Sequence, residues 1–512
     1  MLVNVRFGSF MDGRLVTQVG NVPGVTATVE WQAGLTGRAA VGRTFGVTDL
    51  VMRTDFPVES GDYVMIVSDS GERFDVSLEL DEPAPGADPM AGRTGRVGII
   101  RIFAPPPVRF RLLSVRIQGY RPFSDFNADL GCLELLVGAN GAGKSSLFEF
   151  LRLLRDGLRD EIPPQIVPGP IGQRIFHLPG PERFRWSLDF GTAAAPSERD
   201  GRGSIPWVRY EGELLGPVGR PEVSFERVTP LAPPNASPPP PETYMDVVQG
   251  SGQLRDEGGP ARSLDRPAQR VVLSHPNQLA LGTVTNPALL TLYMLREYIS
   301  GWRFYSAYGI AAEGARRAVP VQQEPVLAED GSNLSAVLHF LYTEHQPIFA
   351  ELQQHLRAAV PGFRSLRVKA RGGPGEVMAF WNEAGVEQEL SLADLSDGTL
   401  RLLCWMVLCL QPNPPTMICI DEPDQGVHPR TLPILAGLFD RACERTQVLL
   451  ATHSSYFLTQ FELDQVAVLR KENGDAAFVK PSDSKTLTEM LADFGADELE
   501  CIHRSDELER LA

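Results

Sequence analysis

The sequence predicts an α/β fold, in which a mixed sheet with a helical lobe follows a small β-rich unit. Three observations support this prediction. An apolar run at residues 133–137 leads through a glycine-rich loop into a segment with helical spacing. From residue 417 onward, short apolar runs alternate with helical segments, as in parallel sheets with crossover helices. Over residues 1–103, short alternating segments are separated by turn residues, which is typical of a small barrel or sandwich.

The composition is that of an ordinary globular protein. The 512 residues are 43% apolar and 22% charged, which suits roughly two to four domains of common size. The net charge of −16 removes the usual argument for a nucleic-acid-binding chain, although a local basic patch stays open. The six cysteines lack CxxC spacing and the eight histidines lack HExxH spacing, so we expect reduced core cysteines and no metal cluster. Without a signal peptide or an apolar run of about 20 residues, we expect a cytoplasmic protein with no membrane span.

Residues 1–103 are expected to form a separate β-rich domain. A proline run at residues 104–107 is a stiff boundary, and a new pattern of strands and helices begins near residue 108. The first segment contains no catalytic constellation that we can identify, so its role is left open. The rest of the chain, residues 108–512, is predicted to be one domain.

A phosphate-binding loop follows the apolar run at residues 133–137. The pattern GxxxxGK[ST] is formed by Gly138, Ala139, Asn140, Gly141, Ala142, Gly143, Lys144 and Ser145, and Ser146 follows. Glycines let successive backbone N–H groups turn toward phosphates, and the helix that begins near Lys144 adds its positive dipole end. Lys144 would reach the β- and γ-phosphates, and Ser145 would bind Mg²⁺. The alternative is a chance glycine turn, which is disfavoured because the whole chain has only five lysines.

Two stretches in the middle of the chain have their own character. Residues 229–270 are rich in proline, glycine and polar residues, and we expect a long insertion loop that is at least partly disordered. Residues 182–230 alternate like antiparallel strands. Helical patterns at 287–299 and 334–360 predict a helical lobe over about residues 287–410.

A second candidate anion site lies at the start of a helical apolar run. Ser396, Asp397 and Gly398 precede this run, and serine and glycine at a helix amino end can bind an anion. A chain with its own phosphate loop needs no second site in cis, so this one would serve the γ-phosphate of a second molecule. The alternative is a simple helix N-cap.

Ionisable residues end the two apolar runs that follow. The run at residues 417–420 leads into Asp421, which would hold Mg²⁺, and Glu422, which would act as general base on the attacking water. The run at residues 448–452 leads into His453, which would touch the γ-phosphate. A solvated acid pair and a structural histidine are the alternatives. The order of the four motifs along the chain makes a coincidence of all four improbable.

These residues resemble the ABC-type ATPases of the RecF, OLD and SMC-related group over about residues 110–512. The resemblance rests on the phrases GANGAGKSSLFEFLRLL, DGSNLSAVLHFL, LSDGTLRLL, ICIDEPDQGVHP and VLLATHSSYFL. It implies an ABC-type P-loop ATPase head that uses ATP and Mg²⁺, with residues 138–146 as Walker A and Asp421-Glu422 as Walker B. It also implies that His453 is the switch histidine and that residues 424–428 form the D-loop.

The same resemblance implies that two heads enclose ATP. Ser396, Asp397 and Gly398 would then form the signature that caps the partner's ATP, and Arg121 would contact the nucleotide. The metal-binding glutamine of such ATPases has no clear counterpart, and Gln173 is our interpretation. The chain lacks the heptads of SMC arms and the acidic clusters of the OLD nuclease domain.

The functional hypothesis is an ATP-hydrolysing switch in DNA metabolism, repair or antiviral defence. It would form an ATP-dependent homodimer or higher oligomer and control a separate effector protein such as a nuclease, with DNA as an open partner. One alternative is a module in which ATP controls assembly without appreciable hydrolysis. Another is a transporter ATPase subunit, which LSDGT in place of LSGGQ and the extra amino-terminal unit disfavour.

Overall fold

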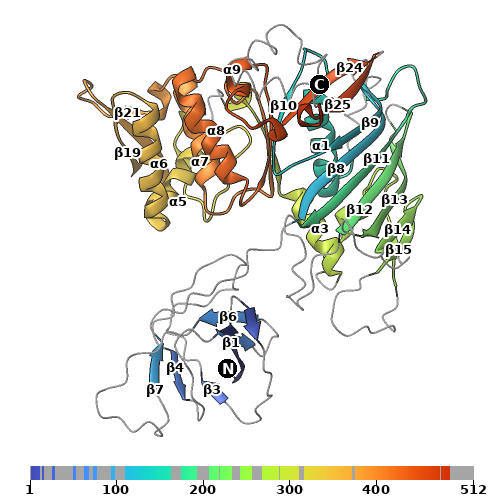
Figure 1. Ribbon diagram of the computed structural model, residues 1–512, viewed down its shortest axis with the longest axis horizontal. Coiled ribbons are helices and arrows are strands. Elements are labelled where there is room, and N and C mark those ends of the chain that lie inside the picture. The colour runs from blue at the N-terminus through green and yellow to red at the C-terminus, as the bar shows by residue number, and fades with distance from the viewer. Residues whose placement is uncertain are drawn as a thin grey trace. The chain divides into compact units, whose positions relative to one another are not determined.

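The chain divides into two compact units in the computed structural model (Figure 1). One comprises residues 1–109 with 194–204, and the other comprises residues 110–193 with 205–512. In the first unit, the structure describes only the backbone of its strands. In the second unit, it describes residues 110–162, 175–192, 207–217, 220–232, 243–255, 268–286, 289–310, 316–371, 375–472 and 474–484.

The described part of the first unit consists of β-strands. One sheet has the order β2-β1-β5-β6, with β3 also paired to β1, and a separate antiparallel pair joins β4 to β7. The bounds are β1 (Leu2–Met11), β2 (Arg14–Val16), β3 (Thr26–Thr28), β4 (Leu50–Arg53), β5 (Tyr63–Val67), β6 (Arg73–Ser77) and β7 (Thr94–Val97). The strands agree with the β-rich character predicted from the sequence. The independence of this unit and its boundary near residue 103 stay predictions.

A six-stranded sheet forms the centre of the second unit. Its order is β17 (Trp302–Ser306), β22 (Met417–Asp421), β23 (Gln447–Ala451), β10 (Leu133–Val137), β24 (Val466–Glu472) and β25 (Asp475–Val479). All neighbours are parallel except the β24–β25 hairpin. Every residue of β10 and β23 is buried, because successive side chains point into two different hydrophobic cores. Leu136 lies in one core, and Leu135 and Val137 lie in the other.

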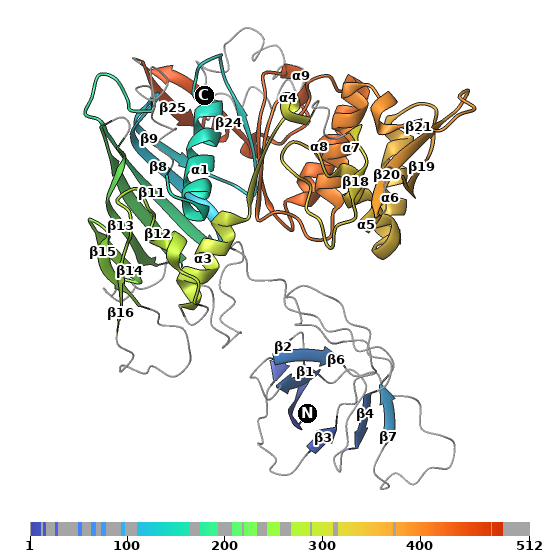
Figure 2. The same ribbon diagram turned by 180° about the vertical axis from the view of Figure 1, so that it is seen from behind.

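The first core is enclosed by an eight-stranded antiparallel sheet. Two helices, α1 (Lys144–Arg159) and α3 (Leu290–Ser300), pack in this core (Figure 2). The strand order and bounds are β16 (Gln269–Val272), β15 (Ser251–Leu254), β14 (Met245–Val248), β13 (Glu222–Leu231), β12 (Trp207–Leu215), β11 (Arg183–Thr192), β8 (Phe110–Tyr120) and β9 (Phe123–Asp129). The antiparallel strands predicted over residues 182–230 are confirmed.

The stretch predicted as an insertion loop at 229–270 differs from the structure. β13 continues to Leu231, and β14 and β15 form a hairpin that extends the same sheet. Backbone pairing with an existing sheet edge satisfies the hydrogen bonds of this polar segment, which its composition alone could not reveal. Residues 233–242 and 256–267 of the predicted loop lie outside the described residues.

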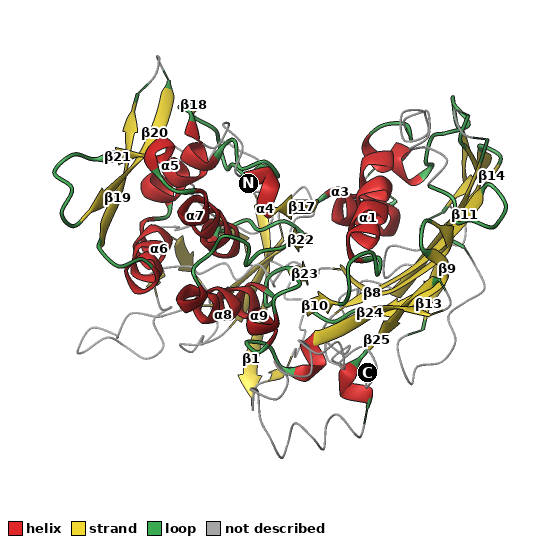
Figure 3. Cartoon of the chain, turned by 90° about the horizontal axis from the view of Figure 1, so that it is seen from above, coloured by secondary structure: helices red, strands yellow, loops and turns green. Residues whose placement is uncertain are grey.

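The second core lies in a helical lobe on the other side of the six-stranded sheet (Figure 3). The lobe helices are α5 (Leu334–Glu344), α6 (Gln346–Ala359), α7 (Asp397–Leu410) and α8 (Leu432–Ala442). A small sheet covers them, built from β18 (Val319–Pro320), β20 (Glu376–Glu383), β19 (Phe363–Ala370) and β21 (Leu390–Ser391). Two short helices, α4 (Ala307–Ile310) and α9 (Ser455–Leu458), follow β17 and β23.

The lobe begins later than predicted. The helical pattern at 287–299 is α3, which packs with α1 in the first core, and β17 then joins the six-stranded sheet. The pattern at 334–360 is two helices, because Pro347 stands in the first turn of α6 and separates it from α5. The predicted α/β fold class, a mixed sheet with a helical lobe, is confirmed.

Two further expectations concern cysteines and membranes. All the cysteines among the described residues are free. Within the same part of the chain, no helix has the length and apolar character needed to cross a membrane.

Candidate nucleotide-binding site

The glycine loop joins the buried strand β10 to helix α1. Gly138, Gly141 and Gly143 have φ angles of 142°, 79° and 115°, which residues other than glycine rarely adopt. At Gly138, a Cβ atom would lie 2.0 Å from the carbonyl oxygen of Leu469 on β24. Glycine is therefore required at this position both by backbone conformation and by the close approach of the neighbouring strand.

Lys144 is held at the centre of this loop. Its side chain is buried, and Nζ donates to the carbonyl oxygens of Gly138, at 2.6 Å, and Ala139, at 3.3 Å. Gly143 is the N-cap of α1 and provides no side-chain cap. No side chain caps the first turn of the helix, which lies beside a fixed ammonium group, and helix amino ends of this kind can bind an external anion. Of the remaining predicted loop residues, Asn140 is exposed and Ala142 is buried.

The carboxyl ends of the parallel strands bring the predicted acids to this loop. Asp421 is the last residue of β22, and its Oδ2 accepts a 3.0 Å hydrogen bond from Ser145 Oγ on α1. The structure thus joins two residues that are far apart in the sequence and that were both predicted to bind Mg²⁺. Among the described residues, no group of three or more His, Cys, Asp or Glu side chains could hold a metal ion. The two oxygen ligands fit Mg²⁺, which commonly completes its coordination with phosphate and water oxygens.

Glu422 and His453 face each other at the same edge of the sheet. Glu422 has a φ of 55° and its N–H donates to the carbonyl of Ala451, the last residue of β23. Glu422 Oε1 lies 3.6 Å from Nε2 of His453, and the backbone N–H of His453 donates to Glu422 Oε2 at 3.4 Å. A residue in this strained backbone region at a strand end is typical of a functional position.

The electrostatics of this pair suit proton transfer near neutral pH. Burial, followed by the neighbouring charges of Asp424 and Asp421, raises the pKa of Glu422 to about 7, against the opposing effect of a hydrogen bond from the His453 backbone. Burial and the ammonium of Lys144 lower the pKa of His453. At pH 7 the histidine is therefore neutral, and Glu422 is close to the balance that a general base requires.

Thr452 is a site residue that the sequence reasoning did not identify. It is fully buried, its N–H donates to the carbonyl of Leu136, and its Oγ1 donates to Asp424 Oδ1 at 2.6 Å. Thr452 therefore links the strand that ends in His453 to the loop that follows Glu422. A polar residue at the end of an otherwise apolar run, directly before the histidine, was the available signal.

The predicted signature lies at the amino end of α7. Ser396 is the N-cap, and its Oγ accepts from the Thr399 N–H at 3.2 Å. Asp397 forms an ion pair with Arg316. A Cβ on Gly398 would lie 2.0 Å from the carbonyl oxygen of Gly426, so the loop after Glu422 packs directly on this helix end.

The signature and the glycine loop are not joined within the chain. Among the described residues, no hydrogen bond or ion pair connects residues 396–398 with residues 138–146. The Arg401 guanidinium instead donates to the Gln425 carbonyl at 3.0 Å, and the Trp405 indole donates to the Pro423 carbonyl at 3.0 Å. The structure thus ties α7 to the loop at residues 423–427.

The structure does not bring two further predicted site residues, Arg121 and Gln173, to the glycine loop by any described contact. Arg121 occupies the turn between β8 and β9, with a φ of 47°, and its guanidinium forms an ion pair with Glu149 on α1. Its nucleotide contact stays a prediction, and the existing partner on α1 was not foreseen. Gln173, our interpretation of the metal-binding glutamine, lies outside the described residues.

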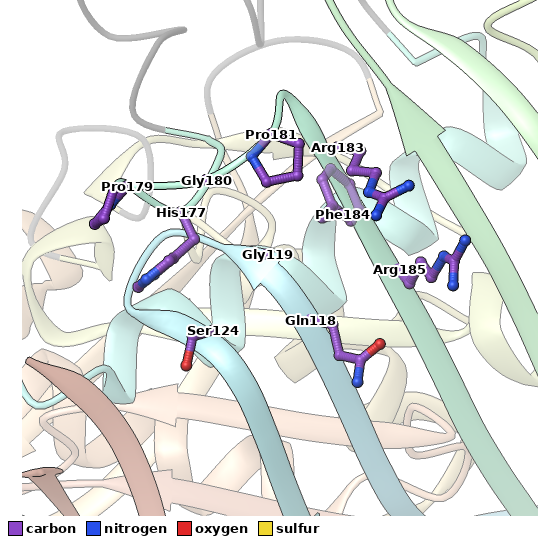
Figure 4. Close-up of a pocket in the computed structure, with 10 residues that line it drawn as sticks. All are labelled: Gln118, Gly119, Ser124, His177, Pro179, Gly180, Pro181, Arg183, Phe184 and Arg185. Carbon is purple, nitrogen blue, oxygen red and sulfur yellow. The ribbon is translucent and has the colours of Figure 1, made fainter.

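A separate pocket of about 320 Å³ lies on the outer side of the β8–β9 turn (Figure 4). His177 lies at one end and Arg185 at the other, with the segment 179–181 above them. None of its lining residues belongs to the glycine loop. The pocket therefore does not include the glycine loop, although its His177 contacts the Arg121 carbonyl.

The region that carries the site is similar to a known protein family. A family model described as "AAA domain, putative AbiEii toxin, Type IV TA system" matches residues 135–459. This range includes the glycine loop, the signature, the acid pair and His453. No curated protein matches the chain.

Solved structures with detectable similarity include heads of SMC proteins. An SMC head bound to the C-terminal winged-helix domain of ScpA has a TM-score of 0.45 at 14% identity, and the match covers 72% of this chain and 96% of that one. An SMC head with an extended coiled coil bound to the C-terminal domain of ScpA, derived from Pyrococcus furiosus, has a TM-score of 0.45 at 11% identity, and the match covers 75% of this chain and 100% of that one. The SMC head domain from Thermotoga maritima has a TM-score of 0.37 at 13% identity, and the match covers 72% of this chain and 98% of that one.

Proposed function

Because the chain belongs to the AAA-domain family whose model matches residues 135–459, we propose that it binds ATP with Mg²⁺ and hydrolyses it as an ABC-type switch. The observation that carries this proposal is the convergence of three features at one sheet edge. Lys144 lies in the glycine loop, Ser145 contacts Asp421, and Glu422 faces His453. Each feature matches one requirement of phosphoryl transfer to water.

Different residues of the site would bind the phosphates, bind Mg²⁺ and accept the proton. The loop N–H groups and Lys144 bind and orient the phosphates, and Ser145 and Asp421 supply oxygen ligands for Mg²⁺, which neutralises phosphate charge when bound. Glu422 accepts a proton from the attacking water. The neutral His453 has an N–H to donate toward the terminal phosphate, and its Nε2 lies 3.6 Å from Glu422 Oε1.

Binding and hydrolysis are tested together by comparing ATP affinity with turnover. Wild-type protein should bind ATP and release phosphate catalytically, and Lys144→Ala should lose most of its ATP affinity because the phosphates lose a direct cationic partner. The exposed Lys369, which pairs with Glu389, provides the matched Lys369→Ala control. Wild-type binding without turnover would favour an ATP-gated assembly module. Near-wild-type affinity in Lys144→Ala would rule out the loop as the nucleotide site.

The biological part of the proposal concerns what the switch controls. We propose that ATP closes a homodimer of heads that controls a separate effector protein, in DNA metabolism or in defence against foreign DNA. The family description, which names a toxin of a toxin–antitoxin system, supports the defence alternative. Affinity purification of Glu422→Gln from the native host with ATP present would identify protein and nucleic-acid partners together. Recovery of membrane transport subunits would contradict the proposal.

The amino-terminal unit has a supporting role in this proposal. We propose that residues 1–103 form a domain for recognition or assembly that is dispensable for ATP binding. A chain that starts near Arg109 should therefore bind ATP with wild-type affinity. Loss of binding in a truncated chain that still folds cooperatively would contradict this role.

A further inference from the structure

The β24–β25 hairpin forms one wall of the glycine loop. At the first glycine, Gly138, the carbonyl of Leu469 on β24 closes off the space for a side chain. At the last, Gly143, a Cβ would lie 3.3 Å from the Cβ of Ala476 on β25. Both ends of the loop therefore lie against the hairpin, and at Gly143 the ring of Phe123 on β9 is closer still, at 3.1 Å.

The middle of the loop is open, with one cationic neighbour. A Cβ placed on Gly141 would meet a single heavy atom within 4 Å among the described residues beyond its chain neighbours, and that atom is Nζ of Lys471, at 3.8 Å. Lys471 is exposed and is paired across the hairpin with Ala476, the residue that touches Gly143. A second lysine thus stands beside the phosphate loop, on a strand that contacts it.

Among the described residues, Lys471 has no carboxylate partner, unlike the lysines on either side of it in the sequence. Lys369 pairs with Glu389, and Lys480 pairs with the buried Glu134. No ion pair of Lys471 occurs in the part of the chain that the structure describes.

The acids of the hairpin are themselves engaged elsewhere. Glu472 pairs with Arg470, and Asp475 lies 3.4 Å from Nε2 of His177. The ammonium of Lys471 is therefore available to an anion beside the glycine loop.

The hairpin is held firmly enough to present this lysine. The Ala476 N–H donates to the Pro122 carbonyl at 3.0 Å, and His177 connects Asp475 to the Arg121 carbonyl through its two ring nitrogens. These contacts fix the hairpin to the β8–β9 turn. The backbone of Lys471 is thus fixed, and only its flexible side chain needs to be ordered by a ligand.

The order of strands places Lys471 opposite the acids. β22 and β23, which lead to Asp421 and His453, lie on one side of β10, and β24 lies on the other. A polyphosphate in the loop would therefore have the Mg²⁺-binding oxygens on one flank and the Lys471 ammonium on the other.

We propose that Lys471 is a second phosphate-binding lysine, which neutralises the flank of the nucleotide's phosphate chain that faces away from Asp421. This inference rests on the proposed function, because it requires the glycine loop to bind a nucleoside triphosphate. It assigns Lys471 to binding rather than to chemistry. The variant Lys471→Gln should consequently weaken nucleotide affinity while leaving turnover at saturating ATP near the wild-type rate.

The test is a titration of the full chain with a fluorescent ATP analogue, followed by displacement with ATP. Lys471→Gln should bind ATP about tenfold more weakly, as expected for the loss of one charge-assisted contact. Lys471→Arg should restore most of the affinity because it retains the charge. Lys369→Gln is the matched surface control and should bind like the wild type. Affinity should also depend less on salt in Lys471→Gln, because one ionic contact is missing.

The outcomes separate this inference from the proposed function. If Lys144→Ala loses affinity while Lys471→Gln binds within about twofold of the wild type, Lys471 makes no phosphate contact and the inference is wrong. An equal loss in Lys471→Arg and Lys471→Gln, or a lowered unfolding temperature without nucleotide, would indicate a packing role and would also overturn it. If Lys144→Ala itself binds normally, the proposed function fails instead.

Discussion

Helices α1 and α7 both carry predicted phosphate-binding residues at their amino ends, but the two ends are completed differently. The first turn of α1 has no side-chain cap and contains the cation Lys144. The first turn of α7 is capped by the Ser396 hydroxyl and contains the acid Asp397, which pairs with Arg316. One helix end thus lacks a side-chain cap and carries a cation, whereas the other is capped by its own serine and carries an acid.

This difference indicates which half of the site could bind nucleotide alone. The α1 end has Asp421, Glu422 and His453 beside it in the same chain, so on the proposed function it would bind ATP without the α7 end. The α7 end contacts the loop at 423–427, and on the proposed function it would reach a nucleotide that a second copy supplies. An isologous pair of heads would give each nucleotide one end of each kind.

The largest effect is expected at Glu422. Glu422→Gln keeps the size of the side chain but removes the proton acceptor, so turnover should fall about 10²–10⁴-fold while ATP affinity is retained. Phosphate release under saturating ATP measures the first quantity, and nucleotide titration measures the second. The exposed Glu444 provides the control, since Glu444→Gln should be unaffected. A loss of less than about tenfold would mean that another group is the base.

The next effect concerns association through the α7 end. Ser396→Arg places an unpaired charge where a second head would close, so ATP-dependent dimerisation should weaken about 100-fold. ATP affinity of the single chain should not change, because no described contact joins residues 396–398 to the glycine loop. Sedimentation of Glu422→Gln with ATP, with ADP and without nucleotide gives the reference, and it should show a dimer only with ATP.

A mixing experiment tests, through ATPase activity, whether the signature of one subunit completes the site of the other. Lys144→Ala and Ser396→Arg subunits are each expected to be inactive alone. In a mixed dimer, one composite site combines the intact loop of one subunit with the intact signature of the other, so part of the activity should return. If the mixture stays inactive although mixed dimers form, the signature does not act in trans.

A smaller, graded effect is expected from pH. Since the pKa of Glu422 is raised to about 7, mainly by burial, the ionised form that acts as base is lost as the pH falls through 7. Turnover at saturating ATP should therefore fall roughly tenfold between pH 8 and pH 6. Burial and the Lys144 ammonium lower the pKa of His453, so its protonation is displaced toward more acidic pH than that of an ordinary histidine. The residual turnover of Glu422→Gln should lack this dependence, and a wild-type profile that is flat over the same range would contradict the role of Glu422.

The α1 half was also the part most open to prediction from sequence. The glycine loop, the acid pair and the strand-end histidine are local patterns, and parallel strands necessarily bring their carboxyl ends to one edge. Contacts between distant segments were not accessible in this way. Examples are the pair between Arg121 and Glu149, the bond from Thr452 to Asp424, and the approach of Leu469 to Gly138.

For the fold as well, local patterns were predictable and contacts between distant segments were not. Periodicity identified the strands and helices, but it did not show that the polar segment at 245–254 would extend a sheet or that α3 would join the first core. Both outcomes depend on tertiary partners that lie far away in the sequence. For α7, the sequence left an N-cap and a signature as alternatives, and the structure shows the cap contact, which is compatible with either role.

The smallest expected effect separates these two roles of Ser396. Ser396→Ala removes the hydroxyl that accepts from Thr399, so unfolding free energy should fall by about 1 kcal/mol in chemical denaturation. Ser396→Asp should preserve most of that stability, because aspartate is also a good N-cap. If Ser396 only caps α7, Ser396→Asp should have wild-type turnover. If it faces the γ-phosphate of a second head, the carboxylate repels that phosphate, and ATP-dependent dimerisation and turnover should fall although the fold is as stable as the wild type. We therefore expect Ser396→Asp to keep wild-type stability but to lose turnover. If both its stability and its turnover equal those of the wild type, only the capping role is left.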